Sequence, residues 1–231
     1  MNSIKENLDK INEHIEKACL KAGRKPEEVR LMAISKTYPL EEIEEAYAAG
    51  QRLFGESRVQ EAAGKFDGFH GDAELHLVGH LQSNKAKTAA TLFSCVQSVD
   101  RIKTAAELDK RCAAAGRTMD ILIEYNTSGE ESKSGILSED ELYRTVDGIS
   151  GLDCIRLKGL MTVGPFTVVE KDIRSSFRLL RELYGRIEQR YPELEMDTLS
   201  MGMSGDYHYA VEEGATLVRI GTAVFGPRSY A

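Results

Sequence analysis

The chain has 231 residues, a length at which an α/β barrel of ~200–250 residues still forms one domain. Hydrophobic residues make up 42% and charged residues 29%, as in ordinary globular proteins. The net charge of −7 argues against nucleic acid or an anionic membrane as the main partner.

The cysteine pattern and the N-terminal sequence indicate the cellular compartment of the protein. Four scattered cysteines, with no C-x-x-C pair, argue against a disulfide scaffold and a structural zinc site and indicate a reducing environment. The N-terminus lacks the apolar stretch of a signal peptide. No segment approaches the ~18 apolar residues of a membrane span. We therefore expect a cytoplasmic protein.

Helices and strands are predicted to alternate along the chain. An amphipathic helix comes first, with Ile4, Leu8, Ile11 and Ile15 at helical spacing. Short β-rich runs follow at residues 29–35, 52–55, 74–79, 94–99, 119–125, 155–162, 196–201 and 217–222, with helical segments between most of them. Eight strands separated by helices imply a parallel sheet, and eight is the number that closes a barrel.

We therefore predict an α/β fold, a single-domain (β/α)8 TIM barrel over residues 1–231 with an extra N-terminal helix. An open doubly wound sheet is the alternative. It is disfavoured because no G-x-G-x-x-G follows the first strand.

Several helix boundaries have their own signals. Pro39, followed by four glutamates, begins a helix that Gly50 ends. Ser138 with Glu141 three residues later predicts a capping box. Gly214 ends the helix before the last strand.

Lys36 closes the apolar run at 31–35, the predicted first strand. A lysine at the carboxyl end of a buried strand is unusual, because its ammonium group prefers water. Burial favours the neutral amine, which is the nucleophile that forms a Schiff base. The alternative is a lysine whose stem is covered while its head reaches solvent.

Polar residues collect at the carboxyl ends of the predicted strands, where barrel sites are built. Ser204 and Gly205 follow the seventh strand and are predicted at a helix N-terminus, which favours an anion. Gly221 and Thr222 end the eighth strand. Phosphate sites in such barrels commonly lie after these two strands. A plain N-cap is the alternative for Ser204.

Strand alternation directs Arg219 toward the same side as Leu217 and Gly221. An arginine inside a barrel needs a partner because its guanidinium group keeps its proton. That partner is either Asp197 or Glu124 in an internal salt bridge, or a ring nitrogen or carboxylate of a ligand.

The spacing of the histidines argues against a shared metal site and against a catalytic triad. His76 and His80 lie four residues apart, which is ~13 Å along a strand and too far to share a metal ion. None of the histidines has a Ser/Asp or Cys partner at a readable motif spacing. We expect neither a metal site nor a catalytic triad.

An anchoring lysine, a phosphate cup and an inward arginine form a coherent site for pyridoxal 5′-phosphate (PLP). The chain moreover resembles the pyridoxal phosphate homeostasis protein family over essentially its whole length. The matching motifs are A-I-S-K-T at 33–37, F-G-E-S-x-V-Q-E at 54–61, H-L-V-G-H-L-Q-S-N-K at 76–85, S-K-S-G at 132–135, G-L-M-T at 159–162, S-M-G-M-S-x-D at 200–206 and R-I-G-T-x-x-F-G at 219–226.

The resemblance implies a fold-type III barrel similar to the N-terminal domain of alanine racemase. It implies that Lys36 carries the Schiff base and that Arg219 faces the pyridine nitrogen. The other implied cofactor-binding residues are Ser204, Gly205, Gly221, Thr222, Ser57 and Met201. The family typically has G-E-N followed by an aromatic residue, whereas this chain has Ser57 and Arg58; Ser57 can still donate a hydrogen bond but is shorter than asparagine.

The function implied is PLP storage and delivery without robust catalysis, with apo-PLP enzymes as recipients and a monomeric protein. An arginine at the ring nitrogen disfavours its protonation, which weakens PLP as an electron sink. The chain also ends at Ala231, without the separate domain that supplies a second acid/base group in alanine racemase. The alternatives are a minimal PLP-dependent racemase or lyase, and a class I aldolase-like barrel that uses Lys36 without PLP.

Overall fold

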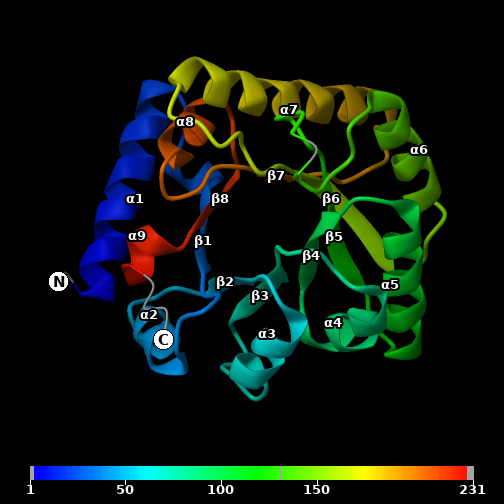
Figure 1. Ribbon diagram of the computed structural model, residues 1–231, viewed down its shortest axis with the longest axis horizontal. Helices are drawn as coiled ribbons and strands as arrows, with labels where there is room; N and C mark the ends of the chain where they lie inside the picture. Colours follow the sequence, from blue (N-terminus) through cyan, green and yellow to red (C-terminus); the bar gives the residue numbers. More distant parts are fainter. Residues whose placement is uncertain (1–2, 131, 228–231) are drawn as a thin grey trace.

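The computed structural model describes residues 3–130 and 132–227. Eight parallel strands follow one another around a closed barrel in chain order (Figure 1). They are β1 Arg30–Ile34, β2 Leu53–Glu56, β3 Glu74–Leu77, β4 Cys95–Val99, β5 Met119–Glu124, β6 Ile155–Met161, β7 Thr198–Ser200 and β8 Leu217–Ile220. Strand β8 pairs with β1, which closes the barrel.

Helices surround the strands (Figure 1). They are α1 Ile4–Lys21, α2 Leu40–Ala48, α3 Val59–Phe66, α4 Ala86–Leu92, α5 Ile102–Ala114, α6 Glu139–Ile149, α7 Glu170–Arg190, α8 Tyr207–Glu212 and α9 Thr222–Phe225. Two short 3₁₀ helices, Pro26–Glu28 and Ser83–Lys85, lie in connecting segments. The predicted barrel and all eight predicted strands are confirmed.

The apolar residues form an outer layer and an inner layer. The main core lies between strands and helices and includes Phe54, Ile121 and Phe177. Smaller clusters lie on the opposite face of the strands; one is Met32, Ile34, Leu53 and Leu217, and the other is Cys95, Leu122 and Met161. Because side chains alternate across a strand, these smaller clusters fill the barrel interior.

Helix α1 stabilises the helices that lie next to the closure of the barrel. Its capping box joins Ser3 and Glu6, and its apolar face is buried. It packs against α8 and α9, beside which it lies in Figure 1. The Asn7 amide donates to the Val224 carbonyl at 2.8 Å, and His14 contacts the Tyr207 hydroxyl at 3.0 Å. α1 therefore braces the two helices that follow β7 and β8.

The helix-boundary predictions hold at the positions that carry special backbone geometry. Gly50 and Gly214 have φ of +102° and +107° and each follows the C-cap residue of its helix, α2 or α8, where other residues would be strained. Ser138 caps α6 by accepting a hydrogen bond from the Glu141 N–H at 3.3 Å. This is one of the two hydrogen bonds of the predicted capping box, so that prediction is confirmed for the N-cap alone. Across residues 3–130 and 132–227, no helix combines the length and apolar composition needed to cross a membrane.

Candidate functional site

A cavity of about 370 Å³ lies at the carboxyl ends of the strands. Seven of the eight sequence-predicted site residues line it: Lys36, Ser57, Ser204, Gly205, Arg219, Gly221 and Thr222. The eighth, Met201, is fully buried in the core between barrel and helices. Met203 lines the cavity instead.

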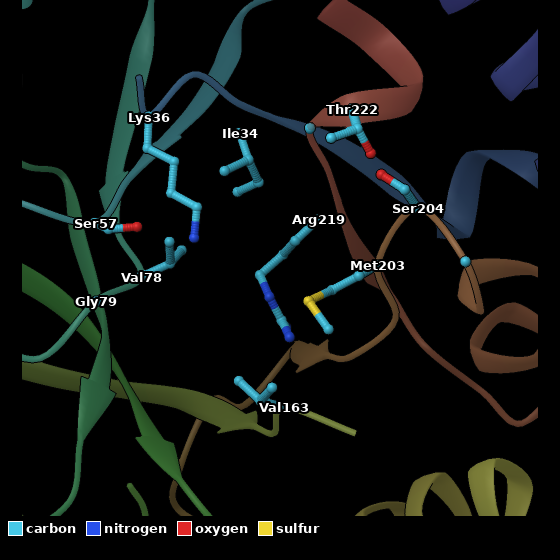
Figure 2. Close-up of a pocket in the computed structure, with 12 residues that line it drawn as sticks. Ile34, Lys36, Ser57, Val78, Gly79, Val163, Met203, Ser204, Arg219 and Thr222 are labelled. Carbon is cyan, nitrogen blue, oxygen red and sulfur yellow. The ribbon is translucent and has the colours of Figure 1, made fainter. Parts of the chain in front are cut away.

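Lys36 lies two residues beyond the end of β1, in a turn. Met32 and Ile34 face the barrel interior, and the same alternation carries Lys36 to the inner side of the rim. Its side chain is half-buried and extends into the cavity (Figure 2). A primary amine is thus presented to a partly desolvated space.

Arg219 enters the same cavity from β8 (Figure 2). One guanidinium nitrogen donates to the Ser200 hydroxyl at 2.7 Å and another to the Thr162 carbonyl at 2.6 Å. Burial lowers its pKa to about 10, against the opposing charges of Glu124 and Asp206. The side chain therefore stays cationic at neutral pH.

Neither carboxylate expected from the sequence accepts a hydrogen bond from Arg219 within the described residues. Glu124 acts on the guanidinium only through its charge. Asp197 lies 3.9 Å from the Lys158 ammonium instead. The guanidinium is held by neutral oxygen atoms, so its positive charge remains available to a ligand.

A hydrogen-bonded row of side chains fixes Arg219 inside the barrel. Ser200, which accepts from Arg219, donates to the Gln97 amide oxygen at 2.7 Å. The Gln97 amide nitrogen lies 2.9 Å from His76 Nδ1, which must accept because an amide NH₂ can only donate. Burial lowers the pKa of His76 to about 3, so its ring is neutral at neutral pH. Its Nδ1 is the last acceptor in this row of hydrogen bonds.

The predicted phosphate cup lies between the loop after β7 and the start of α9. Ser204 and Thr222 point their hydroxyl groups toward one another across it (Figure 2). The Ala223 N–H lies 3.4 Å from the Ser204 hydroxyl oxygen. Gly205 and Gly221 complete the lining, and an added Cβ at Gly205 would meet no atom within 4 Å. Hydroxyl groups and exposed backbone suit an anion.

The prediction that Ser204 and Gly205 stand at the N-terminus of the next helix is wrong. α8 begins only at Tyr207, with Asp206 as its N-cap residue. The Asp206 carboxylate accepts from the Met203 N–H at 2.6 Å, which keeps residues 203–206 in a turn. Ser204 is thereby placed beside α9 rather than at the head of α8.

The cavity walls are apolar, and sequence reasoning did not identify them. Ile34, Val78, Val163 and Met203 line it between the polar groups. Such side chains have no chemical signature, although the positions of Val78 and Val163 just beyond β3 and β6 could have marked them. A mostly apolar cavity with a few convergent polar groups is typical of a small-molecule pocket.

Among residues 3–130 and 132–227, no group of three or more His, Cys, Asp or Glu side chains is arranged to hold a metal ion. The four cysteines are free thiols. His80 is exposed on the rim and, with Arg58 and Ser57, lines a smaller neighbouring groove.

Known proteins resemble this chain in sequence and in structure. The sequence profile of the family described as "Alanine racemase, N-terminal domain" matches residues 2–229. The pyridoxal phosphate homeostasis protein of Vibrio alginolyticus is 43% identical, with 100% of both chains covered. The structure of PipY from Synechococcus elongatus with PLP bound has a TM-score of 0.84 at 35% identity, covering 96% of this chain and 100% of PipY.

More distant structures share the fold alone. Alanine racemase from Bacillus anthracis has a TM-score of 0.72 at 18% identity. The alignment covers 97% of the present chain but 57% of that enzyme. The barrel therefore corresponds to one part of the larger racemase.

Proposed function

Because the chain belongs to the alanine racemase N-terminal domain family, we propose that it binds PLP covalently through Lys36 and serves in PLP homeostasis. One observation carries the proposal. An amine, a guanidinium and two facing hydroxyl groups converge on one apolar cavity of about 370 Å³, within the ~300–1,000 Å³ range of small-molecule sites.

The residues present fit PLP group by group. Ser204 and Thr222, with the backbone of Gly205 and Gly221, would hold the phosphate. Arg219 would face the ring nitrogen, and the apolar walls would cover the ring faces. PLP supplies an aldehyde, which condenses with a primary amine with loss of water. Lys36 supplies that amine from the inner rim.

Reductive trapping of the Schiff base, followed by peptide mapping, tests the assignment of Lys36. Protein loaded with PLP is reduced with borohydride, digested and analysed by peptide mass spectrometry. We expect a pyridoxyl adduct on Lys36, its loss in Lys36→Ala, and its retention in Lys87→Ala, an exposed change on α4. An adduct confined to another lysine would overturn the assignment. A purified protein that takes up no PLP would favour the aldolase-like alternative.

We also propose that the bound cofactor is stored rather than used for amino-acid turnover. The cation of Arg219 at the ring nitrogen disfavours the protonated ring that stabilises carbanions. Chiral chromatography of L- and D-amino acids after incubation with the loaded protein tests this. Steady racemisation or cleavage that disappears in Lys36→Ala would support the racemase or lyase alternative.

Delivery to apo-PLP enzymes, by a monomer in the cytoplasm, completes the proposal. Met203, Gly205 and Thr222 line the cavity and are exposed, so a ligand there can be reached from solvent. Mixing the loaded protein with an apo-PLP enzyme should restore its activity at least as fast as the same concentration of free PLP. Slower recovery would contradict delivery, and sedimentation would report the oligomeric state.

A further inference from the structure

The backbone directly after Lys36 has an unfavourable conformation. Thr37 has φ of +68° and, within residues 3–130 and 132–227, is the sole non-glycine residue with a positive φ. A β-branched residue in this region is an outlier, because its Cβ crowds the following carbonyl oxygen. Some contact must therefore hold the turn.

Glu61 on α3 provides that contact. Its Oε1 accepts a hydrogen bond from the Thr37 N–H at 2.5 Å. The turn is closed on its other side by the Tyr38 N–H, which donates to the Ser35 carbonyl at 3.1 Å. Glu61 thus binds the peptide group that joins Lys36 to Thr37.

Lys65, one helical turn further along α3, connects this contact to the strand before Lys36. Its ammonium group lies 2.6 Å from Glu61 Oε1 and 3.2 Å from Glu56 Oε1, and it donates to the Ser35 carbonyl at 3.0 Å. The Ser35 hydroxyl donates to Glu56 Oε1 at 2.7 Å. Both chain neighbours of Lys36 are therefore tied to one group of charged side chains.

This group is shielded from water. Glu56 is fully buried, and the side chains of Lys65 and Glu61 are 15% and 24% exposed. Partial burial raises the pKa of Glu61, but the hydrogen bonds from Lys65 and the Thr37 N–H bring it below the ordinary value. Glu61 is therefore an ionised acceptor at neutral pH, and charged acceptors make the stronger hydrogen bonds.

Glu56, Glu61 and Lys65 lie on the helix-facing side of β2, because Leu53 and Gly55 take the inward positions. They do not line the cavity that Lys36 enters. Their contact with the site passes through the backbone of residues 35–37.

We propose that Glu61 is a positioning residue for Lys36: by holding the Thr37 N–H in a left-handed turn, it directs the Lys36 amine into the cavity. Lys65 orients the Glu61 carboxylate and ties it to Ser35. This inference rests on the proposed function, because the turn is proposed to present the Lys36 amine to the aldehyde of PLP.

Two ligands separate positioning from general damage to the site. PLP has the aldehyde that reacts with Lys36, whereas pyridoxine 5′-phosphate has the same ring and phosphate without it. In Glu61→Ala we expect PLP affinity to fall roughly tenfold, the effect of losing one charge-assisted hydrogen bond. Affinity for pyridoxine 5′-phosphate should stay within about twofold.

Amide hydrogen exchange of the unliganded protein provides a second measurement. The Thr37 N–H should exchange at least tenfold faster in Glu61→Ala, since its protecting acceptor is lost. Glu61→Gln keeps an acceptor oxygen but loses the charge, and it should lie between Glu61→Ala and wild type in both measurements. Glu107→Ala removes a comparable i,i+4 ion pair, with Arg111 on α5, and should change neither.

The outcomes distinguish the positioning role of Glu61 from the proposed function of Lys36. Unchanged PLP affinity in Glu61→Ala, with the wild-type adduct on Lys36, would overturn the positioning role. Equal weakening of both ligands would also overturn it, because the effect would be structural only. A wild-type protein without a Lys36 adduct would instead overturn the proposed function, and the assigned task with it.

Discussion

Gly79 lies against the backbone of Ser57 at the cavity rim, where β3 has just ended. A Cβ atom built on Gly79 would stand 2.2 Å from the Ser57 carbonyl oxygen and 2.9 Å from its carbonyl carbon. Both atoms belong to the backbone, so relief requires a shift of the chain rather than of a flexible side chain. Gly79 therefore sets the distance between two residues that line the cavity.

We predict that Gly79→Ala lowers the free energy of unfolding by about 1–3 kcal/mol, because the closely packed backbone must shift to admit the added methyl group. Urea unfolding measures the change. Gly64→Ala on α3 is the matched control: no atom lies within 4 Å of its added Cβ, and alanine in a helix should gain about 0.5–1 kcal/mol. A Gly79→Ala protein as stable as wild type would contradict the close approach.

Residues with a clear chemical signature could be predicted individually. Lys36 and Arg219 stand out because each is a cation within an apolar run, and both line the cavity. Glu61 could not be predicted, because Glu61 and Lys65 read as an ordinary solvent-facing i,i+4 pair. Their role depends on their distances to Ser35 and Thr37, which lie more than twenty residues away in the chain.

The proposed phosphate cup belongs to two elements, the loop after β7 and the start of α9. Neither would form it alone, since Ser204 comes from one and Thr222 from the other. α1 braces this arrangement through the contact of Asn7 with the Val224 carbonyl in α9. Recognition of a phosphate group by this chain would thus depend on how these elements pack together.

We predict that Ser204→Ala combined with Thr222→Val weakens PLP binding about 10–100-fold, the effect of losing hydrogen bonds to a charged group. Binding of pyridoxal, which lacks the phosphate, should change less than about twofold. Equilibrium titrations of both ligands by absorbance test the difference. If pyridoxal binding weakens as much as PLP binding, the two hydroxyl groups do not serve the phosphate.

At the element scale, the sequence predicted where strands lie better than where the chain leaves them. β7 ends at Ser200, and Gly202 then turns the chain with φ of +92°. Its Cβ position lies 2.6 Å from the Ala210 Cβ, so the turn fits closely against α8. Beyond this point strand alternation no longer applies, which is why Met203 and not Met201 lines the cavity.

At the scale of the whole molecule, the number and order of strands sufficed to predict the closed barrel. The polar content of its interior could not be predicted, because it depends on which inward side chains meet across the barrel. Glu124, near the end of β5, is 6% exposed. Burial raises its pKa to about 7, although the charge of Arg219 opposes this rise and that of Asp100 adds to it.

Two buried groups should give the stability of the protein opposite pH dependences. Glu124 prefers its neutral form in the folded state, so its contribution is full below its ordinary pKa of 4.5 and is lost as pH rises toward about 7. His76 also prefers its neutral form. Its contribution is full above 6.5 and is lost as pH falls toward about 3.

We predict that Glu124→Gln abolishes the loss of stability as pH rises. The loss of stability as pH falls should remain. Between pH 4.5 and 7.5, the free energy of unfolding of the variant should rise relative to wild type by about 3 kcal/mol. Urea unfolding across this range measures the difference, and Glu188→Gln on the exposed side of α7 controls for the change in net charge. Parallel profiles for Glu124→Gln and wild type would show that Glu124 is already ionised in the fold. Its charge would then balance Arg219, and the guanidinium would have less positive charge to offer a ligand.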